Sequence, residues 1–515
     1  MPRLFRLLLV PVASLLLAGV AAADVKLPAI FGDNMVLQRE KKVPVWGTAS
    51  PGEDVTVSML GQKVSTKAAP SGKWRVDLNP LSVGGPYEMT VAGNNKVTFK
   101  NVLVGEVWVC SGQSNMEWHV EWCKDPVEET ANAKYPQIRL IMVKKTVAGE
   151  PQSDFVPDMK WSECSPQTIP KFSAVGYYFG RKLHKELNVP VGLINDCWGG
   201  TVCEAWTSHE ALAADPDYSA ILERRKSAEA YPTLKIKYEA DLKAWSTAVA
   251  EAKAAGKKAP AKPQAPRNPN ADPNFASNLY NGMLAPVIPY AIRGAIWYQG
   301  ESNADRAYQY RKLFPAMITD WRKQWNQGDF PFYFVQLANY MARKNKPAES
   351  GWAELREAQA MTLKTPHTGM AVIIDIGDAK DIHPKNKQDV GLRLALNALA
   401  KDYGQAVEFS GPKYESLKIE GNSARLTFSH IGKGLVAKGG ELKGFAVCGK
   451  DKKFVWATAK IDGESIVVSS PDVKEPVAVR YAWADNPECN LYNQDSIPAS
   501  PFRTDSFPGV TVGKN

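Results

Sequence analysis

From residue 24 to about residue 100, the chain consists of short runs in which apolar and polar residues alternate. A period of two is typical of strands with one buried face. Turns rich in glycine and proline, such as Ser50-Pro51-Gly52, separate the runs. The pattern predicts a β-sandwich-like domain over residues 24–100. Its predicted strands are Val43–Trp46, Val55–Val57, Trp74–Leu78, Tyr87–Val91 and Val97–Phe99.

From residue 101 to residue 403, continuous apolar runs alternate with segments of helical periodicity. Such alternation predicts an α/β domain in which helices cover both faces of a parallel sheet. The predicted strands are Val102–Cys110, Ile138–Val143, Val191–Asn195, Gly294–Tyr298, Phe332–Leu337 and Met370–Ile376. The predicted helices are Val175–Leu187, Arg306–Trp325, Trp352–Thr365 and Asp389–Tyr403.

Two further regions have their own patterns. Residues 214–274 are rich in Ala, Lys, Glu and Pro, and we interpret them as an inserted helical hairpin with a proline-rich return. Residues 404–515 return to a β pattern and predict a carboxyl-terminal β-rich domain. Its predicted strands are Val407–Phe409, Arg425–Phe428, Phe445–Val447, Ser465–Ser469 and Val477–Trp483.

The first 23 residues have the pattern of a signal peptide. Arg3 and Arg6 precede the apolar run Leu7–Val20, and three alanines end at Ala23. We therefore expect an exported protein, periplasmic or secreted, that starts at Asp24 and has no membrane span after cleavage. An oxidising compartment permits disulfides, but the spacing of the seven cysteines does not settle their pairing.

Charge changes the picture only by exclusion. The formal net charge of +9 is mild for 515 residues, and the lysines are scattered. Because there is no basic stripe interleaved with aromatic residues, the sequence argues against a nucleic-acid partner. Cys and His residues do not have the spacing of a zinc site, and we expect neither a metal nor an organic cofactor. The oligomeric state stays open.

Candidate chemistry lies in four polar turns that follow predicted strands. The carboxyl edge of an open α/β sheet is where ligands bind. Ser114 follows the first strand as a candidate nucleophile, although a Ser/Asn turn that caps the next helix is the alternative. Gly200 follows another strand and offers a backbone N–H that can approach an oxyanion. Gln299 follows a third and offers its side-chain amide.

The fourth turn supplies a base. Of the six histidines, His383 has a carboxylate, Asp381, two residues before it and lies beyond a strand end. A serine nucleophile needs a neighbouring imidazole, and a carboxylate that orients the ring completes a triad. Asp378 is the alternative acid, and a Ser–His dyad assisted by a backbone carbonyl is a further one.

These blocks together carry a resemblance. The motifs GQSNM, WGGT, WYQGESNA and DIHP, in this order, resemble the SGNH-hydrolase superfamily and most closely its sialate O-acetylesterase family. The resemblance covers nearly the whole chain after residue 23. It implies a three-layer flavodoxin-like domain over residues 101–403, and hydrolysis of acetyl esters on sugars.

The resemblance also implies roles for individual residues. Ser114 is then the nucleophile and His383 the base, with an oxyanion hole formed by the Ser114 and Gly200 N–H groups and the Gln299 side chain. The chain departs from the superfamily in two places. It has Gln299 where many relatives have Asn, and it has Lys380 where the wider superfamily has the triad aspartate.

The expected function is that of a carbohydrate esterase acting on an O-acetylated sugar, sialic acid in the first place. The same constellation serves an acetylxylan or other plant-polysaccharide acetylesterase, which is the rival enzyme. A non-catalytic carbohydrate-binding protein is the rival of another class, because two β-rich flanks and abundant aromatic residues also suit sugar binding.

Overall fold

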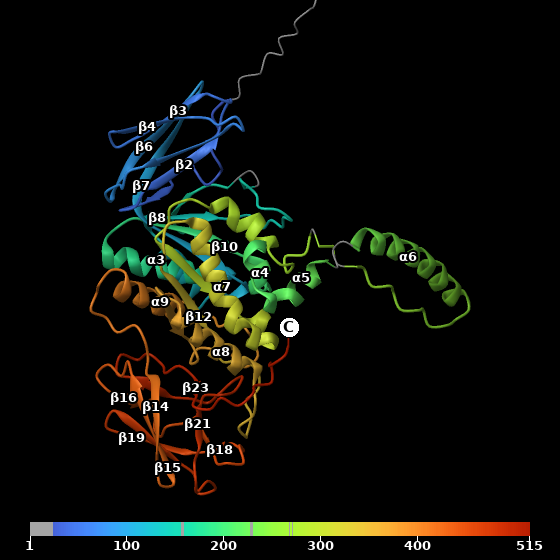
Figure 1. The fold of residues 1–515 in the computed structure, drawn as a ribbon, viewed down its shortest axis with the longest axis vertical. Helices are drawn as coiled ribbons and strands as arrows, with labels where there is room; N and C mark the ends of the chain where they lie inside the picture. Colours follow the sequence, from blue (N-terminus) through green and yellow to red (C-terminus); the bar gives the residue numbers. More distant parts are fainter. Residues whose placement is uncertain (1–23, 156–158, 227–229, 267, 270, 515) are drawn as a thin grey trace, which may run out of the picture.

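The computed structural model describes residues 24–155, 159–226, 230–266, 268–269 and 271–514. The expected signal peptide, residues 1–23, lies outside these described residues. An α/β region occupies the middle of the molecule, with amino-terminal strands at one end of the long axis and carboxyl-terminal strands at the other (Figure 1). No helix among the described residues has the length and apolar character needed to cross a membrane.

The amino-terminal region consists of strands, as the alternating pattern predicts. Strand β5 shows the reason, because its residues alternate strictly between exposed and buried. β3 pairs antiparallel with β4 and β6, while β2 and β5 form a separate pair. The strands are β1 (Val36–Gln38), β2 (Val43–Thr48), β3 (Asp54–Met59), β4 (Gln62–Lys67), β5 (Lys73–Leu78) and β6 (Gly84–Ala92).

One long strand, β7 (Lys96–Gly112), connects this region to the next. Its first half pairs with β6, and its second half pairs with strands of the central sheet. We predicted two strands, Val97–Phe99 and Val102–Cys110, separated near residue 100. The structure has one strand, in which Asn101 adopts a local left-handed conformation with φ of 55°. The polar residues around Asn101 interrupt the apolar pattern without interrupting the strand.

The central sheet has the strand order β13-β12-β11-β7-β10-β8-β9. We predicted a parallel α/β sheet, and the pairings from β13 to β8 are all parallel, but the edge strand β9, which we did not predict, is antiparallel to β8. Strands β10 to β13 are buried throughout, since both faces are covered, and they therefore appear in the sequence as continuous apolar runs. The strands are β8 (Tyr135–Met142), β9 (Ser162–Cys164), β10 (Val191–Cys197), β11 (Gly294–Tyr298), β12 (Phe332–Gln336) and β13 (Thr368–Val372).

Helices pack on both faces of this sheet. Trp108 of β7 contacts Phe179 of α3 with ring centroids 5.0 Å apart, whereas Trp297 of β11 contacts Trp321 of α7 at 5.8 Å. α3 also packs on α9, and α7 packs on α8. The helices are α1 (Ser114–Glu117), α2 (Pro126–Ala131), α3 (Ala174–Leu187), α4 (His209–Ala213), α7 (Ala307–Trp325), α8 (Gly351–Met361) and α9 (Lys387–Lys401).

The connections give the carboxyl end of β7 a special place. After β7 the chain builds β8 and β10 on one side of it, and then crosses to build β11, β12 and β13 on the other side. A sheet of this kind opens a crevice where the strand order reverses. The end of β7 lies at the point where the strand order reverses.

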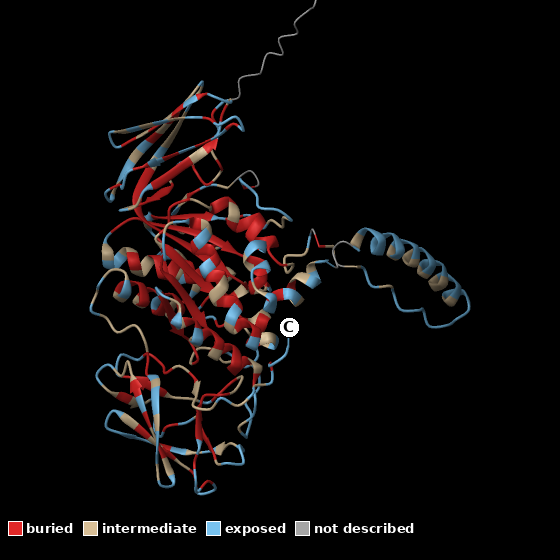
Figure 2. Cartoon of the chain, viewed as in Figure 1, coloured by how far each residue is buried: buried red, intermediate tan, exposed pale blue. Residues whose placement is uncertain are grey.

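The insertion projects from the body of the molecule. It contains α5 (Ser219–Lys226) and α6 (Tyr231–Ala254), and α6 has no buried residue (Figures 1 and 2). The expected helical hairpin thus has one long helical arm. Its return, around Pro260, is irregular and lies along the helix, where Trp245 Nε1 donates to the Pro260 carbonyl at 2.9 Å.

The carboxyl-terminal region is β-rich, as expected, with its own small core. The predicted strand Val407–Phe409 was wrong, since these residues form no strand. β14 was missed because most of its residues are exposed and show no apolar alternation. The strands are β14 (Lys413–Glu420), β15 (Ser423–Ser429), β16 (Leu435–Ala437), β17 (Phe445–Cys448), β18 (Val455–Trp456), β19 (Thr458–Asp462), β20 (Ser465–Ser469), β21 (Ala478–Tyr481), β22 (Leu491–Asn493) and β23 (Phe502–Arg503).

Candidate active site

Ser114 begins a short helix directly after β7. The strand ends at Gly112, whose φ is 141°, and a Cβ there would lie 2.2 Å from the Tyr298 carbonyl oxygen. Only glycine accepts this conformation beside the neighbouring strand. The tight turn places the half-buried Ser114 at the carboxyl edge of the central sheet, as the first residue of α1.

His383 reaches Ser114 from the loop after β13, the strand at one edge of the central sheet. Its loop follows β13, and its Nε2 lies 2.9 Å from the Ser114 Oγ. Its Nδ1 lies 3.2 Å from Asp381 Oδ1, which also accepts the His383 backbone N–H at 2.9 Å. Asp378 instead accepts the Lys380 N–H at 2.7 Å and caps its own turn. The structure therefore brings Ser114, His383 and Asp381 together and directs Asp378 elsewhere.

The environment of His383 favours a neutral ring. Burial lowers the pKa of the imidazole, and the nearby Lys387 charge lowers it further, while Asp381 raises it. The ring stacks on Trp118, with centroids 4.7 Å apart and planes at 17°. A neutral imidazole beside a hydroxyl is the state required of a general base.

The Gly199-Gly200 turn lies against Ser114. A Cβ at Gly199 would be 3.2 Å from the Ser114 Cβ, and the Gly199 N–H donates to Glu117 Oε2 at 2.6 Å. Glu117 belongs to the same short helix as Ser114 and also binds Lys145 at 2.6 Å. Gly200 is exposed, with φ of 74°, and its N–H has no acceptor among the described residues. Gly200 thus has a free N–H and directly follows Gly199, which lies against the serine.

Gln299 is not free in the same way. It is fully buried, and its Nε2 donates to the Thr201 carbonyl at 3.1 Å and to Asn303 Oδ1 at 2.7 Å. Its Oε1 accepts the Tyr310 hydroxyl at 2.9 Å. Both amide hydrogens are therefore used, so the structure does not bring the expected third oxyanion donor to Ser114. The amide instead supports Thr201, the residue after Gly200.

Sequence reasoning missed several residues around the pair. Glu117 and Trp118 follow Ser114 within the helix turn, and Asn115 and Lys387 form a buried contact beneath it. The signal for Asn115 was its place inside GQSNM. Lys387 carried a weaker one, because a lysine at the start of an amphipathic helix usually indicates an exposed position.

A cavity of about 650 Å³ opens at the carboxyl ends of β8 and β10. Lys144, Lys145 and Lys160 line it, together with His119. Its one acidic lining residue is Glu117, which is already bound to Lys145. Lys144 and Lys160 have no acidic partner among the described residues, so the cavity beside the serine turn is positively charged.

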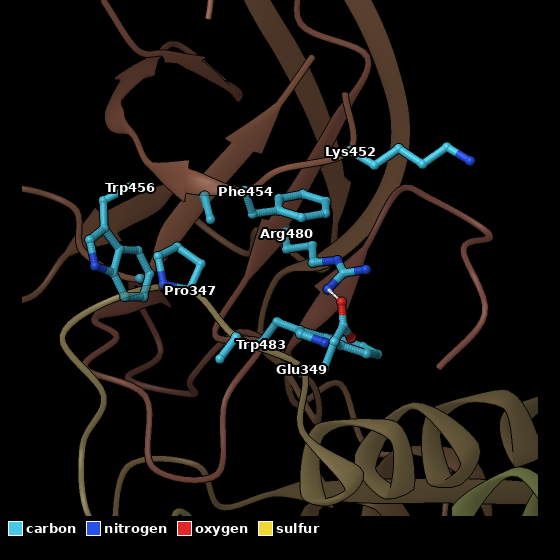
Figure 3. Close-up of a pocket in the computed structure, with 10 residues that line it drawn as sticks. Pro347, Glu349, Lys452, Phe454, Trp456, Arg480 and Trp483 are labelled. Atoms are coloured by element: carbon cyan, nitrogen blue, oxygen red, sulfur yellow. Dashed lines mark hydrogen bonds and ion pairs between the residues drawn. The ribbon is translucent and has the colours of Figure 1, made fainter. Parts of the chain in front are cut away.

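A separate aromatic pocket of about 200 Å³ lies between the carboxyl-terminal region and the loop that holds Pro347 and Glu349 (Figure 3). Two of its three aromatic rings, Phe454 and Trp483, are covered by arginine side chains of the protein itself, whereas Trp456 is exposed. The Arg480 guanidinium lies 4.1 Å from the Phe454 ring centroid and 5.1 Å from that of Trp483, and it pairs with Glu349 at 2.8 Å. This arrangement leaves no free face on those two rings for a sugar on the arginine side, and it is explained by packing.

Among the described residues, all seven cysteines are free thiols, six of them buried. Burial raises the pKa of the Cys110 thiol beneath the serine turn, which removes it as a nucleophile at neutral pH. No group of three or more His, Cys, Asp or Glu side chains in the described parts could hold a metal ion.

Comparison with known proteins identifies the family of the chain. The family model for carbohydrate esterases described as sialic acid-specific acetylesterases matches residues 104–240 and 272–400. Sialate O-acetylesterases from Pongo abelii and Homo sapiens are each 31% identical, with 95% of both chains covered. A crystal structure of a carbohydrate acetylesterase from Xanthomonas citri is 38% identical with a TM-score of 0.80, covering 94% of this chain and 100% of that one. The chain therefore belongs to the sialic acid-specific acetylesterase family of carbohydrate esterases, and it is a carboxylic ester hydrolase.

Proposed function

We propose that this esterase removes O-acetyl groups from sugars with Ser114 as nucleophile and His383 as general base. The contact of 2.9 Å between Ser114 Oγ and His383 Nε2, backed by Asp381, is the observation that carries the proposal. The proposal includes a three-layer, flavodoxin-like SGNH arrangement for the central region. The parallel strands β13-β12-β11-β7-β10-β8 and the helices on both faces support it.

The reaction proceeds in two steps. His383 takes the Ser114 proton while the oxygen attacks the acetyl carbonyl, and then returns that proton to the departing sugar oxygen. Water attacks the acetyl-enzyme in the second step and releases acetate. Asp381 holds the ring and stabilises the imidazolium.

The developing oxyanion needs donors next to Ser114. The Ser114 N–H has no acceptor within its helix, since it is the first helical residue. The Gly200 N–H is the second donor, and each such donor contributes about 3 kcal/mol to the barrier reduction. Gln299 supports this pair through Thr201.

The proposed substrate is an O-acetylated sialic acid. Two curated relatives are named as sialate O-acetylesterases, and the charge of the neighbouring cavity fits a sugar that carries a carboxylate. Lys144 and Lys160 are the cavity residues whose charge is available for it. We also propose that residues 1–23 direct export, so that amino-terminal sequencing of the protein outside the cytoplasm begins at Asp24.

Acetate release tests the proposal directly. The enzyme is compared with Ser114→Ala on O-acetylated sialic acid, acetylated xylan and p-nitrophenyl acetate. We expect the sialic acid ester to be the best sugar substrate and Ser114→Ala to be inactive on all three while staying folded. Faster release from xylan would move the substrate to plant polysaccharides, and undiminished activity of Ser114→Ala would refute the nucleophile. Binding without any release would indicate a sugar-binding protein.

The cavity is tested by charge reversal. We expect Lys144→Glu with Lys160→Glu to raise KM for acetylated sialic acid about tenfold or more and to leave p-nitrophenyl acetate unaffected, because only the sugar is anionic. Lys63→Glu, at an exposed position of the amino-terminal β4, is the matched control. An equal KM change for both substrates would remove the cavity from substrate binding.

A further inference from the structure

Two buried residues, Asn115 and Lys387, and the half-buried Glu301 connect the two loops that carry Ser114 and His383. Lys387 Nζ donates to Asn115 Oδ1, and Asn115 Nδ2 donates to Glu301 Oε1 at 2.6 Å. Asn115 Nδ2 also donates to the Ile382 carbonyl at 3.1 Å. Asn115 directly follows Ser114, and Ile382 directly precedes His383. The Lys387–Asn115–Glu301 network therefore joins the nucleophile turn to the base loop through one side chain.

The chemistry of the partners fixes the orientation of that side chain. An ammonium group offers only donors, so the carbonyl oxygen of Asn115 must face Lys387. Glu301 and the Ile382 carbonyl offer acceptors, so the amide nitrogen must face them. With Lys387 in place the amide has one satisfied orientation, and in that orientation it holds the backbone next to His383.

Lys387 also acts on His383 by charge. Its side chain is fully buried at the start of α9, with Nζ 5.7 Å from the centroid of the Trp118 ring that stacks on His383. The titratable groups that influence Lys387 are Glu301, Asp381 and Cys123, and those that influence His383 are Asp381 and Lys387 itself. A buried positive charge at this position opposes protonation of the imidazole.

We propose that Lys387 is a positioning residue of this esterase, which fixes the Ser114–His383 contact through Asn115 and keeps His383 neutral through its own charge. The inference rests on the proposed serine mechanism. Burial lowers the pKa of Lys387 to about 7, so the side chain is charged across the acid range in which His383 titrates.

The test compares Lys387→Met with Lys385→Met in the full chain. Both variants lose one lysine from the same loop region, but Lys385 is exposed and Lys387 is buried. With p-nitrophenyl acetate, we expect Lys387→Met to lower kcat about 10- to 100-fold with little change in KM, because small displacements of reacting groups have effects of this size. Its acid limb of kcat/KM should move to higher pH, since the charge that lowers the His383 pKa is gone. Lys385→Met should match the wild type.

Asn115→Ala separates position from charge. It breaks the bridge but keeps Lys387, so we expect a similar loss of kcat with an unmoved acid limb. The double variant should lose less than the product of the two single effects, because both act through one contact.

The proposal is overturned if Lys387→Met and Lys385→Met have the same kcat and the same acid limb. Should Lys387→Met not fold, Asn115→Ala decides, and a kcat within twofold of the wild type would overturn the positioning role. Ser114→Ala is run in parallel. If it keeps its activity, the serine mechanism has failed, whereas an inactive Ser114→Ala with a normal Lys387→Met rejects only the present inference.

Discussion

Two polar turns at the same edge of the central sheet differ in exposure and in hydrogen bonding. The Ser114 turn after β7 leaves its hydroxyl half-buried and 2.9 Å from an imidazole that reaches it from a different loop. Gln299, in the turn after β11, is fully buried, and both hydrogens of its side-chain amide have an acceptor within the fold. Both turns follow an apolar strand, and each contains a glycine, Gly112 before Ser114 and Gly300 after Gln299.

The difference shows what distinguishes a reactive group from a structural one. A side chain whose hydrogen-bonding capacity is fully used cannot stabilise a transition state without first losing those bonds. Ser114 has one partner that can also take its proton, whereas Gln299 has three partners that only hold it. Both side chains lie at the same edge of the sheet, but only the amide of Gln299 has all its hydrogen bonds made within the protein.

The largest effect is expected at the Ser114 turn. His383→Gln removes the base, so the kcat of p-nitrophenyl acetate hydrolysis should fall about 10³- to 10⁶-fold. Circular dichroism and the melting temperature should stay close to those of the wild type, since His383 is half-buried in a loop and glutamine fills a similar volume. A loss smaller than tenfold in folded protein would mean that another group takes the proton.

Asp381 and Asp378 sharpen the comparison within one loop. Asp381→Asn should lower kcat/KM about 10- to 1000-fold, because the ring loses its orienting carboxylate. Asp378→Asn should stay within a few-fold of the wild type, because that side chain caps its own turn. The reverse order would assign the triad acid to Asp378, and two small effects would indicate a Ser–His dyad.

Gln299→Met tests the other side of the comparison. The change leaves the Tyr310 hydroxyl and the Thr201 carbonyl without their partner, while Asn303 Oδ1 keeps the Cys203 N–H, so the free energy of unfolding should fall by about 2–4 kcal/mol. The kcat of the folded protein should decrease less than tenfold. An oxyanion donor would behave differently, with a loss of about 10²- to 10³-fold in kcat and an unchanged stability. Urea unfolding and kinetics on the same sample distinguish the two.

The smallest effect is a shift along the pH axis. Activity needs neutral His383, and burial lowers its pKa from the ordinary 6.5, so kcat/KM should persist below that pH and fall only as the pH passes the lowered value. Asp381→Asn removes an interaction that raises this pKa and should move the acid limb to still lower pH. An acid limb above pH 6.5 in the wild type would contradict the burial of the ring.

Much of the architecture follows from periodicity. The parallel sheet could be predicted because its strands are buried on both faces, and Ser114 and His383 because a nucleophile and a base are rare residue types at strand ends. The roles of Gln299 and Lys387 could not. The partners of Gln299 come from three distant segments, and a lysine can be recognised as buried only when the residues that enclose it are known. The prediction divided β7 at Asn101 because a polar residue between two apolar runs usually marks the end of a strand. In the structure this residue changes only the local backbone conformation.

Strand β7 connects the amino-terminal region directly to the turn that holds Ser114. One strand of 17 residues starts in that region and ends two residues before the serine, so the two regions share a continuous strand that pairs with β6 in its first half and with the central sheet in its second. Proteolytic removal of the first strands would expose the edge of β7 and loosen its register at the far end. In the intact protein, heating should melt both regions in a single cooperative transition. A truncated enzyme that starts near residue 96 should lose its activity together with its fold.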